Sequence, residues 1–578
     1  MPTINPLILS VTHINDTHSH FEPSPITLSL PDSHMQIKTT TGGFARIKNV
    51  VEHFRQQAKE KQQGFLFLHA GDCFQGSLYY SLFKGDINAR LLNMLGLDAM
   101  TLGNHELDLG NGPVSDFLSD IHFPLLAGNW DVSHELPNKT KRLSDKPQLR
   151  PYLAKQKRAD VVIKEFNGHQ VAIFGVSIDK MSAIANPDPD TPFVSSLEVV
   201  KNTVKRLHDQ GIKNIILLSH LGYAADLDMA EQVDGLSVII GGHSHTLQGD
   251  FSALGLGFEE PYGRCESGTL VLQACCHAMF LGAVELEFNS HGEVTHHSGN
   301  NFLLLDEDCC QNASLTDGNS DIDDVDAKRE AICALKQQDN VLFTKTENDI
   351  HDVIGRDYKP AVHRLESDIV TFVPHLLRHI RVPDQKGGSE IAPLVCEAML
   401  FSARCRGIPA DFAIHNAGGV RVSVSSGSLT AAEIAGRLLP FEIDIVEYRV
   451  SGKQVRLALE GAIDNAINNG INGTGDGSFP YTAYLRFDYD KDLPIGRRIS
   501  SLQYRVENEW RSVEDNGLYR SVSSAYTTKG KEGYDALEHP GNNVRSVGVT
   551  LSESFIEYAR TIESLEPVKP DMAGFQRF

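Results

Sequence analysis

The feature that most constrains the fold of this chain is a series of short apolar segments separated by stretches with a helical pattern. All of them lie within residues 1–305, and the clearest have the sequences LILSVTHI, FLFLHAG, NIILLSH and LSVIIGG. One intervening stretch, INARLLNMLG, places Leu91, Leu92 and Leu95 on one side of a helix. Strands that alternate with helices in this way indicate α/β layers. We therefore expect an α/β fold for the N-terminal part of the chain.

Five of the predicted strands are followed directly by polar side chains that bind metal ions well. In chain order, these side chains are Asp16, His18, Asp72, Asn104, His220, His243 and His245. Ligands of parallel α/β sheets bind beyond the carboxyl ends of the strands, so these side chains should meet at one rim. Residues two apart on an extended chain point the same way, which lets the two i, i+2 pairs of this set each approach a common site.

This set of seven nitrogen and oxygen ligands exceeds what one tetrahedral metal ion needs, and it suits two ions that share a carboxylate. Asp72 is the natural bridge, because each of its two oxygens can bind one ion. Imidazole together with carboxylate favours Zn, Mn, Fe or Co over calcium. Two ions about 3.5–4 Å apart can clamp the attacking and leaving oxygens of a phosphoryl displacement and lower the pKa of a bound water. The strand ends therefore predict a site for two divalent metal ions.

Each piece of this pattern is weak by itself, because a single histidine at a strand end is usually an ordinary polar residue. The prediction depends on all five segments occurring in order, each after an apolar strand. His13, His20, His69 and His277 lie nearby in the sequence, but no ligand role is left for them.

The composition limits the class of protein. A chain of 578 residues is long enough for two domains or a few. Its formal charge of −22 argues against nucleic-acid binding through a basic face, but bound cations can still reverse the local charge for a small anionic ligand. We expect no transmembrane span and no leader, because apolar runs are short and MPTINPLILSVTHIND lacks a basic region. Nine cysteines without a CxxC motif favour free thiols, and nothing indicates an oligomeric state.

An acidic and polar stretch, DEDCCQNASLTDGNSDIDDVDAK, follows residue 305 and has no apolar period. We interpret it as an exposed connection. The overlapping sequence DDVDAKREAICALKQQ begins with acidic residues and has Lys336 near its end, which is typical of a helix. The sequence thus predicts an N-terminal domain at 1–305, a linker with a helix at 306–338 and a C-terminal domain at 339–578.

The motifs at the strand ends resemble the signature of the calcineurin-like metallophosphoesterases. They are Asp16-Thr-His18, Gly71-Asp72, Gly103-Asn104-His105-Glu106, His220 and Gly242-His243-Ser244-His245. The longer segments LHAGDCFQGSLYYSLFKG and DAMTLGNHELDLG are similar to the 5′-nucleotidases, which include UDP-sugar hydrolases, and HNAGGVRVSVSSGSLTAAEIAGRLLPFE resembles the C-terminal nucleotide-binding domain of that family. The resemblance implies an N-terminal four-layer α/β/β/α sandwich, a linker helix and a C-terminal α+β nucleotide-binding domain.

The resemblance also implies roles for the residues of the N-terminal domain. It places metal site one at Asp16, His18, Asp72 and His245, and metal site two at Asp72, Asn104, His220 and His243. It makes His105 and Asp108 a catalytic dyad. As an imidazolium, His105 can donate a hydrogen bond to a phosphoryl oxygen and stabilise charge in the transition state. Asp108, three residues on, can hold the ring and favour its protonated form.

In the C-terminal domain the resemblance implies a substrate loop of Asn416, Gly418, Gly419 and Arg421, a nucleobase clamp of Phe441 and Tyr526, and a ribose contact from Glu532. The glycines allow close backbone approach, and an arginine can bind phosphate through two hydrogen bonds. The chain departs from the family pattern at Ala417, where glycine is usual, at Tyr526, where phenylalanine is usual, and in GKEG, which replaces GGDG. A further arginine of the family has three candidates here, Arg378, Arg381 and Lys386.

The resemblance implies a metal-dependent enzyme that hydrolyses nucleoside 5′-monophosphates and extends to nucleotide diphosphates such as UDP-sugars. A 2′,3′-cyclic-nucleotide phosphodiesterase with 3′-nucleotidase activity is the alternative within the same class. A metal-holding protein that binds nucleotides without turnover is the alternative from another class, and an intact His105 and Asp108 speak against it. Family members are usually exported, whereas this chain shows no leader, so the compartment stays open.

Overall fold

The computed structural model describes residues 6–31, 35–316, 321–322, 324–468, 475–507, 509–538, 541 and 543–568. The chain divides into two compact units, of which unit 1 is Met1–Gln75 with Phe83–Lys359 and unit 2 is Gly76–Leu82 with Pro360–Phe578. The domain limits at residues 305 and 338 stay predictions. Residues 317–320 and 323 of the predicted linker lie outside the described residues.

Unit 1 is built around two sheets that pack face to face. The larger sheet has the strand order β21 (Val341–Phe343), β18 (Val294–Leu305), β17 (Phe280–Phe288), β1 (Leu7–Ile14), β4 (Gly64–His69), β5 (Ala99–Thr101), β6 (Leu125–Ala127), β7 (Leu149–Leu153) and β8 (Arg158–Ala159). The smaller sheet has the order β15 (Arg264–Glu266), β16 (Thr269–Leu272), β12 (Val238–Ile240), β11 (Asn214–His220), β10 (His169–Ser177) and β9 (Val162–Phe166). Alternate side chains such as Leu9 and Val11 of β1 and Leu218 of β11 fill one buried cluster between them.

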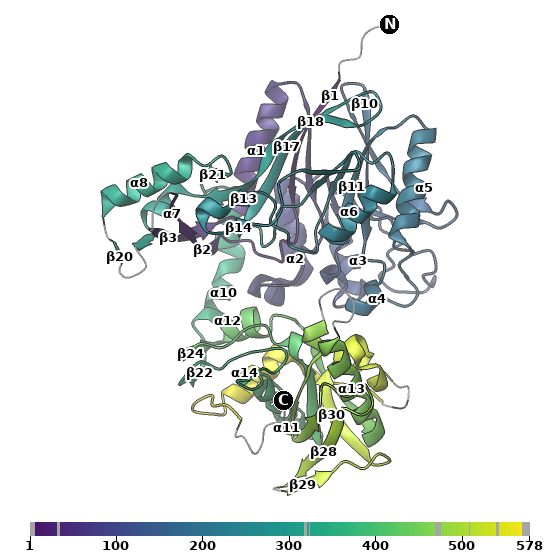
Figure 1. Cartoon of the computed structure of the whole chain (residues 1–578), viewed down its shortest axis with the longest axis vertical. Helices are drawn as coiled ribbons and strands as arrows, with labels where there is room; N and C mark the ends of the chain where they lie inside the picture. Colours follow the sequence, from purple (N-terminus) through teal and green to yellow (C-terminus); the bar gives the residue numbers. More distant parts are fainter. Residues whose placement is uncertain are drawn as a thin grey trace. The chain divides into compact units, whose positions relative to one another are not determined.

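Helices cover the outer face of each sheet (Figure 1). On the larger sheet, α1 (Phe44–Glu60) contacts β1 and β4. On the smaller sheet, α5 (Ser196–Asp209) and α6 (Tyr223–Gln232) cover the face opposite the inter-sheet core, where Val200 and Leu217 are buried in one cluster. The predicted α/β/β/α sandwich is therefore confirmed.

All five strands whose ends carry the predicted metal ligands are present, and they belong to two sheets rather than one. In the larger sheet, β1, β4 and β5 are parallel neighbours. In the smaller sheet, β11 and β12 are parallel neighbours. The expected rim is consequently formed where the carboxyl ends of two sheets come together. The helix predicted from INARLLNMLG is part of α2 (Leu78–Leu95), in which Leu91, Leu92 and Leu95 are buried.

The acidic stretch after residue 305 contains more regular structure than an exposed connection. The side chain of Asp306 accepts a hydrogen bond from the backbone of Asp308, 2.9 Å away, and caps a short helix. Cys310 and Leu315 are fully buried, which anchors an otherwise polar segment. Its elements are α7 (Glu307–Gln311), β19 (Ser314–Thr316), which pairs with β3 (Gln36–Thr41), β20 (Asp321–Ile322) and α8 (Val325–Lys336). The predicted helix is α8, which ends at Lys336 as expected.

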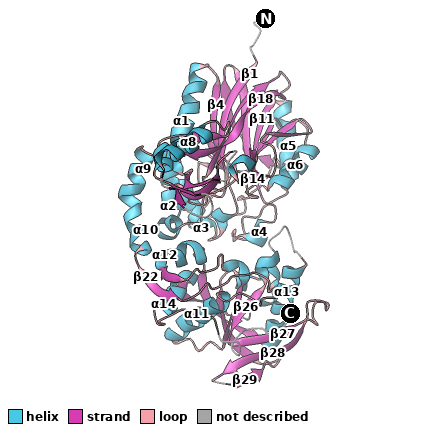
Figure 2. Ribbon diagram, turned by 60° about the vertical axis from the view of Figure 1, so that its left-hand side comes forward, coloured by secondary structure: helices cyan, strands magenta, loops and turns pink. Residues whose placement is uncertain are grey.

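Unit 2 contains a five-stranded sheet with helices on it and a separate three-stranded sheet (Figure 2). The first has the order β26 (Pro480–Ala483), β23 (Phe412–Asn416), β30 (Leu518–Ser524), β25 (Asp444–Ser451) and β31 (Arg545–Thr550), and the second contains β27 (Leu485–Tyr489), β28 (Ile499–Val506) and β29 (Glu509–Ser512). Within the five-stranded sheet, only β23 and β30 pair in parallel. This mixed pairing agrees with the predicted α+β domain.

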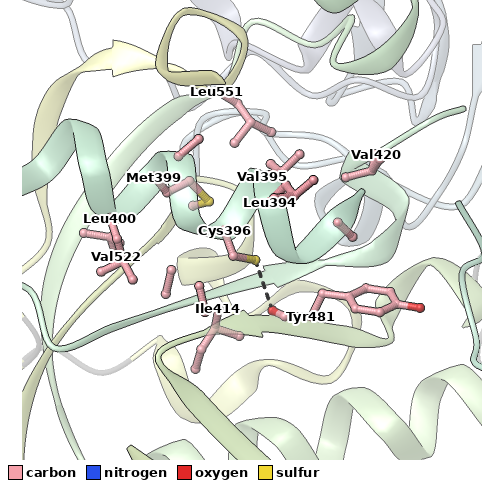
Figure 3. Packing of buried hydrophobic residues seen from close by; sticks show 14 of the residues in the cluster. Leu394, Val395, Cys396, Met399, Leu400, Ile414, Val420, Tyr481, Val522 and Leu551 are labelled. Carbon is pink, nitrogen blue, oxygen red and sulfur yellow. Dashed lines mark hydrogen bonds between the residues drawn. The ribbon is translucent and has the colours of Figure 1, made fainter. Parts of the chain in front are cut away.

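The core of unit 2 forms where α11 (Ala392–Cys405) packs on this sheet. Figure 3 shows Val395, Cys396 and Met399 of the helix and Ile414 of β23 as members of one buried cluster. The Cys396 thiol donates a hydrogen bond to the carbonyl oxygen of Tyr481, 3.4 Å away, so even the sulfur is satisfied in this apolar layer. All nine cysteines of the chain are free thiols. Among the described residues, no helix is both long and apolar enough to cross a membrane.

Candidate metal centre and substrate pocket

The first group of ligand atoms lies beyond β1 and β12 and consists of Asp16, His18 and His245. The His245 Nε2 atom is 3.3 Å from Oδ1 of Asp16 and 3.2 Å from Nε2 of His18. Asp16 is fully buried and His18 is nearly so. Two imidazole nitrogens and a carboxylate oxygen that face one point need a proton or a cation between them, so this group can hold a metal ion.

The second group lies beyond β4, β11 and β12 and consists of Asp72, His220 and His243. The Nδ1 atom of His220 lies 2.8 Å from the carbonyl oxygen of Ala70, and donation of its proton there leaves Nε2 free to bind. That Nε2 atom is 3.1 Å from Oδ2 of Asp72. Burial lowers the pKa of His220, but the negative charge of Asp72 outweighs this effect and raises it to about 10. The group therefore attracts positive charge.

Asn104 supplies an independent indication that a cation fits here. Its side chain is 5% exposed, and its Oδ1 atom has no hydrogen-bond partner among the described residues. A buried acceptor without a donor is costly unless a cation completes it. The neighbouring Gly103 is required, because a Cβ atom at this position would lie 2.1 Å from Oδ1 of Asp72. The predicted donor set of carboxylate, imidazole and amide oxygen thus suits divalent metal ions.

The backbone is left-handed rather than extended at five of the seven predicted ligands. The residues with positive φ are Asp16 (49°), His18 (47°), Asp72 (58°), His243 (72°) and His245 (57°). Such conformations are uncommon outside glycine and concentrate at functional sites. The argument that residues i and i+2 share a site because the chain is extended is therefore wrong, since the chain is not extended at these pairs. His243 and His245 join different groups, because the chain turns between them.

Sequence reasoning assigned no role to Glu106, although this residue organises the loops around the centre. Its buried carboxylate accepts hydrogen bonds from the backbone N–H groups of Asp72 (3.2 Å), Cys73 (2.7 Å), Phe74 (3.1 Å) and Gly103 (2.7 Å). It thereby ties the loop after β4 to the loop after β5. The available sequence signal was a glutamate next to His105 in the loop after a buried strand, but its partners are backbone groups that no motif reveals.

The predicted dyad is formed in the structure. The Nδ1 atom of His105 lies 2.6 Å from Oδ2 of Asp108, one turn further along the 3₁₀ helix η1 (His105–Leu107). Burial lowers the pKa of His105, but the charges of Asp108 and Asp72 outweigh it and raise the pKa to about 9. The His105 ring lies 5.2 Å from that of His18. A cationic donor with 28% of its side chain exposed therefore stands beside the first ligand group.

In unit 2, the predicted substrate residues fall into two linked groups. Asn416 ends β23 and donates from Nδ2 to Oε2 of Glu532, 3.3 Å away, and Tyr526 forms a further hydrogen bond with this carboxyl. The Arg421 guanidinium lies over the Phe441 ring, 5.3 Å from its centre. Electrostatic interaction between Arg421 and Glu532 joins the two groups. Burial raises the pKa of Glu532 to about 7.

Of the three candidates for the further cation, Arg381 is the one that interacts with these substrate residues. Burial lowers the pKa of Arg421, and the positive charge of Arg381 lowers it further. The same charge acts to lower the pKa of Glu532. Arg378 instead pairs with Asp384 at 2.6 Å, and the backbone of Lys386 bonds the same carboxylate. The Nη1 atom of Arg381 lies 2.9 Å from Oδ1 of Asp476, a residue that no sequence motif singled out.

The substrate loop itself is tightly packed. Gly418 and Gly419 lie in the 3₁₀ helix η4 (Ala417–Gly419), which directly follows β23. A Cβ atom at Gly419 would lie 2.2 Å from Nε2 of His415, and one at Gly418 would lie 3.3 Å from the backbone of Gly477. Ala417, the departure from the family pattern, is fully buried. The extra methyl group at this position is therefore accommodated inside unit 2.

Comparison with known proteins places these two sites in one family. The family model for calcineurin-like phosphoesterases matches residues 9–247, and that for the 5′-nucleotidase C-terminal domain matches residues 370–539. The chain is 30% identical over 549 residues to a protein of Treponema pallidum named "Probable 5'-nucleotidase", covering 92% of this chain and 87% of that protein. The chain belongs to the 5′-nucleotidase family.

Two further similarities extend over almost the whole chain. An "NAD 5'-nucleotidase" of Haemophilus influenzae is 27% identical over 578 residues, covering 96% of this chain and 90% of that protein. The crystal structure of a 5′-nucleotidase precursor from Thermus thermophilus matches with a TM-score of 0.69 at 26% identity, covering 98% of this chain and 99% of that one. The protein is accordingly a metal-dependent enzyme that hydrolyses nucleotide phosphoesters with the help of divalent ions.

Proposed function

We propose that this enzyme hydrolyses nucleoside 5′-monophosphates to the nucleoside and phosphate. The observation that carries the proposal is the His105–Asp108 pair, at 2.6 Å, beside two groups of metal-ligating atoms. A protein that only holds metal and nucleotide needs neither member of this pair. The unit 2 pocket, with two arginines and two aromatic residues, supports a nucleotide rather than a simple phosphate ester as the substrate.

The proposed metal centre holds two divalent ions, chosen from Zn, Mn, Fe and Co. Asp16, His18 and His245 would hold the first, Asn104, His220 and His243 would hold the second, and Asp72 would serve both. When bound, the ions polarise the phosphoryl group and activate water for attack. The buried surroundings strengthen every electrostatic interaction at this centre.

The dyad acts on the transferred phosphoryl group. The His105 imidazolium donates a hydrogen bond to a phosphoryl oxygen, where negative charge develops as the ester bond breaks. Asp108 accepts from Nδ1 of the ring, which fixes the orientation of the ring. The charge of Asp108 also raises the pKa of His105, which favours the protonated donor.

Unit 2 supplies substrate recognition. We assign the nucleobase to the faces of Phe441 and Tyr526, and the ribose hydroxyls to Glu532. Asn416 and the backbone of Gly418 and Gly419 shape the loop that the substrate approaches. Arg421 and Arg381 then bind anionic oxygens. On this assignment residues 1–305 carry the chemistry, 339–578 carry the specificity, and 306–338 form the linker.

A nucleotide diphosphate is the second candidate substrate. Two arginines lie close enough to interact in one pocket, which suits more than one anionic group. The relative from Haemophilus influenzae is named for NAD, a dinucleotide with a pyrophosphate bridge. We therefore include UDP-sugars and NAD among the phosphoesters that this enzyme accepts.

A turnover assay over a substrate panel tests the proposal. It compares 5′-, 3′- and 2′,3′-cyclic nucleotides with UDP-glucose, NAD and a small aryl phosphate, at saturating divalent metal. We expect the largest kcat/KM for a nucleoside 5′-monophosphate. Preferential turnover of cyclic nucleotides would instead identify a cyclic phosphodiesterase. Nucleotide binding without any release of phosphate would make the protein a binder.

A further inference from the structure

Two side chains next to the metal centre have no part in the proposed mechanism. Cys276 and His277 lie in the segment that follows β16, and both are half-buried. The ligand atoms offered by Cys276, His277 and His245 all lie within 4.8 Å of one another. A thiol and two imidazoles at such separations form a ligand set for a thiophilic cation. His245 is at the same time a member of the first metal-ligand group.

The surroundings of this cluster are also unusual. The ring of His20 stacks on that of His277 with 4.3 Å between the centroids, and the Cys275 sulfur lies 4.0 Å from the Cys276 sulfur. Cys275, His277 and Ala278 adopt left-handed φ values of 60°, 56° and 53°. The backbone N–H of His277 donates to the carbonyl oxygen of Asp16 at 2.8 Å. This tightly turned segment is thus fastened to the loop that carries the first metal-ligand group.

His245 connects the two ligand sets and cannot serve both at once. A neutral imidazole binds a metal ion through one ring nitrogen while the other nitrogen carries the proton. Its Nε2 atom lies 3.3 Å from Oδ1 of Asp16, which places it in the first group. With 38% of its side chain exposed, it is also the least buried member of that group. A ligand that is shared and accessible can be drawn from one set to the other.

We propose that Cys276, His277 and His245 form an inhibitory site for a thiophilic divalent cation, such as Zn²⁺ or Cd²⁺. Binding converts the Cys276 thiol to the thiolate and releases its proton to solvent. It removes His245 from Asp16 and His18, so the first metal-ligand group loses one of its ligands and hydrolysis slows. This inference depends on the proposed metal centre, but its main test does not depend on turnover.

The experiment adds Cd²⁺ to the full-length enzyme loaded with Mn²⁺, in a reducing buffer without thiols. We expect the thiolate-to-cadmium absorption in the ultraviolet to rise together with loss of nucleotide hydrolysis. Cys276→Ser should abolish the absorption and the Cd²⁺ inhibition while leaving Mn²⁺-supported activity unchanged. His277→Gln should weaken cadmium binding by about tenfold, the loss that follows from about 1.4 kcal/mol. Cys333→Ser, at an exposed position on α8, is the matched control and should behave as the parent.

Several results would overturn the proposal. One is an unchanged ultraviolet absorption in Cys276→Ser, since another thiol would then bind the cation. Another is equal Cd²⁺ inhibition of the parent and of Cys276→Ser, since the cation would then simply replace the resident metal. If Cys276→Ser unfolds early, His277→Gln carries the test, and unchanged cadmium binding in that variant refutes the site. A thiolate signal in an enzyme without nucleotide turnover would refute only the proposed function.

Discussion

The proposed metal centre of unit 1 and the proposed substrate site of unit 2 are built in different ways. The predicted metal ligands follow the ends of buried strands, and their loops are held by the carboxylate of Glu106. The residues of the pocket lie largely on short turns, and Arg381 and Asp476 have 38% and 50% of their side chains exposed. By contrast, the side chains of His220 and Asp72 are 0% and 2% exposed.

This difference shows how one fold can keep its chemistry while its specificity changes. A ligand fixed by packed strands and a strained backbone tolerates little movement, and small displacements are costly in catalysis. Exposed turns accept substitutions without loss of the core. Two of the departures from the family pattern in unit 2, at Tyr526 and in GKEG, lie on such turns, whereas the third, Ala417, is buried. Substitutions in the two regions should therefore have effects of very different size.

The largest effect is expected at Asp72. Asp72→Ala should release both metal ions and lower kcat by roughly 10³-fold or more, because the ions supply several kcal/mol and each 1.36 kcal/mol is a factor of ten. His245→Ala should weaken mainly one ion. Metal content and kcat are measured together on the two variants. Retention of two ions by Asp72→Ala would contradict the bridging role, as would a single ion in the fully loaded parent.

The next largest effect is expected at the dyad. His105→Ala should keep the metal ions but lower kcat by roughly 10²–10³-fold, the loss of one transition-state donor. Asp108→Asn is the matched variant, since it keeps the shape of the side chain and removes its charge. Kinetics on a nucleotide with a poor leaving group, with metal analysis alongside, provide the measurement. A kcat close to that of the parent would exclude the proposed role of His105.

A smaller and more selective effect is expected in the clamp. Phe441→Ala or Tyr526→Ala should raise KM for nucleotides by about tenfold, because base stacking on an aromatic ring contributes about 1–3 kcal/mol. Hydrolysis of a small aryl phosphate and thermal stability should stay unchanged. Phe479→Ala, in the buried core of the same unit, is the control and should cost about 3–5 kcal/mol of stability. Early unfolding of both clamp variants without a nucleotide-selective loss would refute the clamp.

Arg381 and Arg378 offer a matched pair for the next smaller effect. Arg381→Ala should raise KM for nucleotides about fivefold, since a partly exposed charge contributes roughly 1 kcal/mol. Arg378→Ala should leave KM unchanged, because Arg378 pairs with Asp384 instead. Steady-state kinetics on both variants distinguish the two. The reverse order of effects would show that the wrong arginine has been assigned to the pocket.

The smallest effect is a pH dependence at Glu532. Burial raises its pKa to about 7, so the carboxyl is largely neutral below this pH and charged above it. A charged carboxylate accepts ribose hydroxyl groups more strongly, and KM for nucleotides should fall about threefold as pH rises through 7. The ratio of KM for the nucleotide to KM for an aryl phosphate removes the contributions of the metal centre to the pH dependence. Glu532→Gln should flatten this ratio, and an equally steep ratio in that variant would assign the titration elsewhere.

The sequence predicts the metal ligands, because one pattern, an apolar strand followed by a polar side chain, repeats along the chain. Seven candidate ligands at five strand ends follow from apolar segments and the residues after them, and the structure brings these ends together. What could not be predicted depends on contacts between distant segments. Glu106 acts on backbone groups 32 to 34 residues away, and Asp476 meets Arg381 across 95 residues. No local pattern encodes such partners.

The fold was predictable where it depends on local sequence patterns. The errors in its prediction arise where it depends on contacts between distant segments. Short apolar segments indicated the strands, and charged residues at its two ends indicated the helix α8, because these signals depend on neighbours in the sequence. The sequence patterns missed β19, which pairs with β3, almost 280 residues earlier, as well as with β20. They also missed the left-handed backbone at five of the ligands, since the enrichment of Asp and His at positive φ is too weak to identify single positions.

The ion pair between Arg381 and Asp476 affects how an anion binds at the proposed substrate site. At 2.9 Å, the carboxylate already occupies the guanidinium that a phosphate would use. A phosphate that binds Arg381 therefore replaces the carboxylate of Asp476. The ion pair of Arg381 and Asp476 has no net charge, so it does not attract the phosphate from a distance. The selectivity of this replacement depends on the geometry and the charge of the incoming anion. A divalent phosphate that can bridge two guanidinium groups displaces the carboxylate more readily than a monovalent anion does.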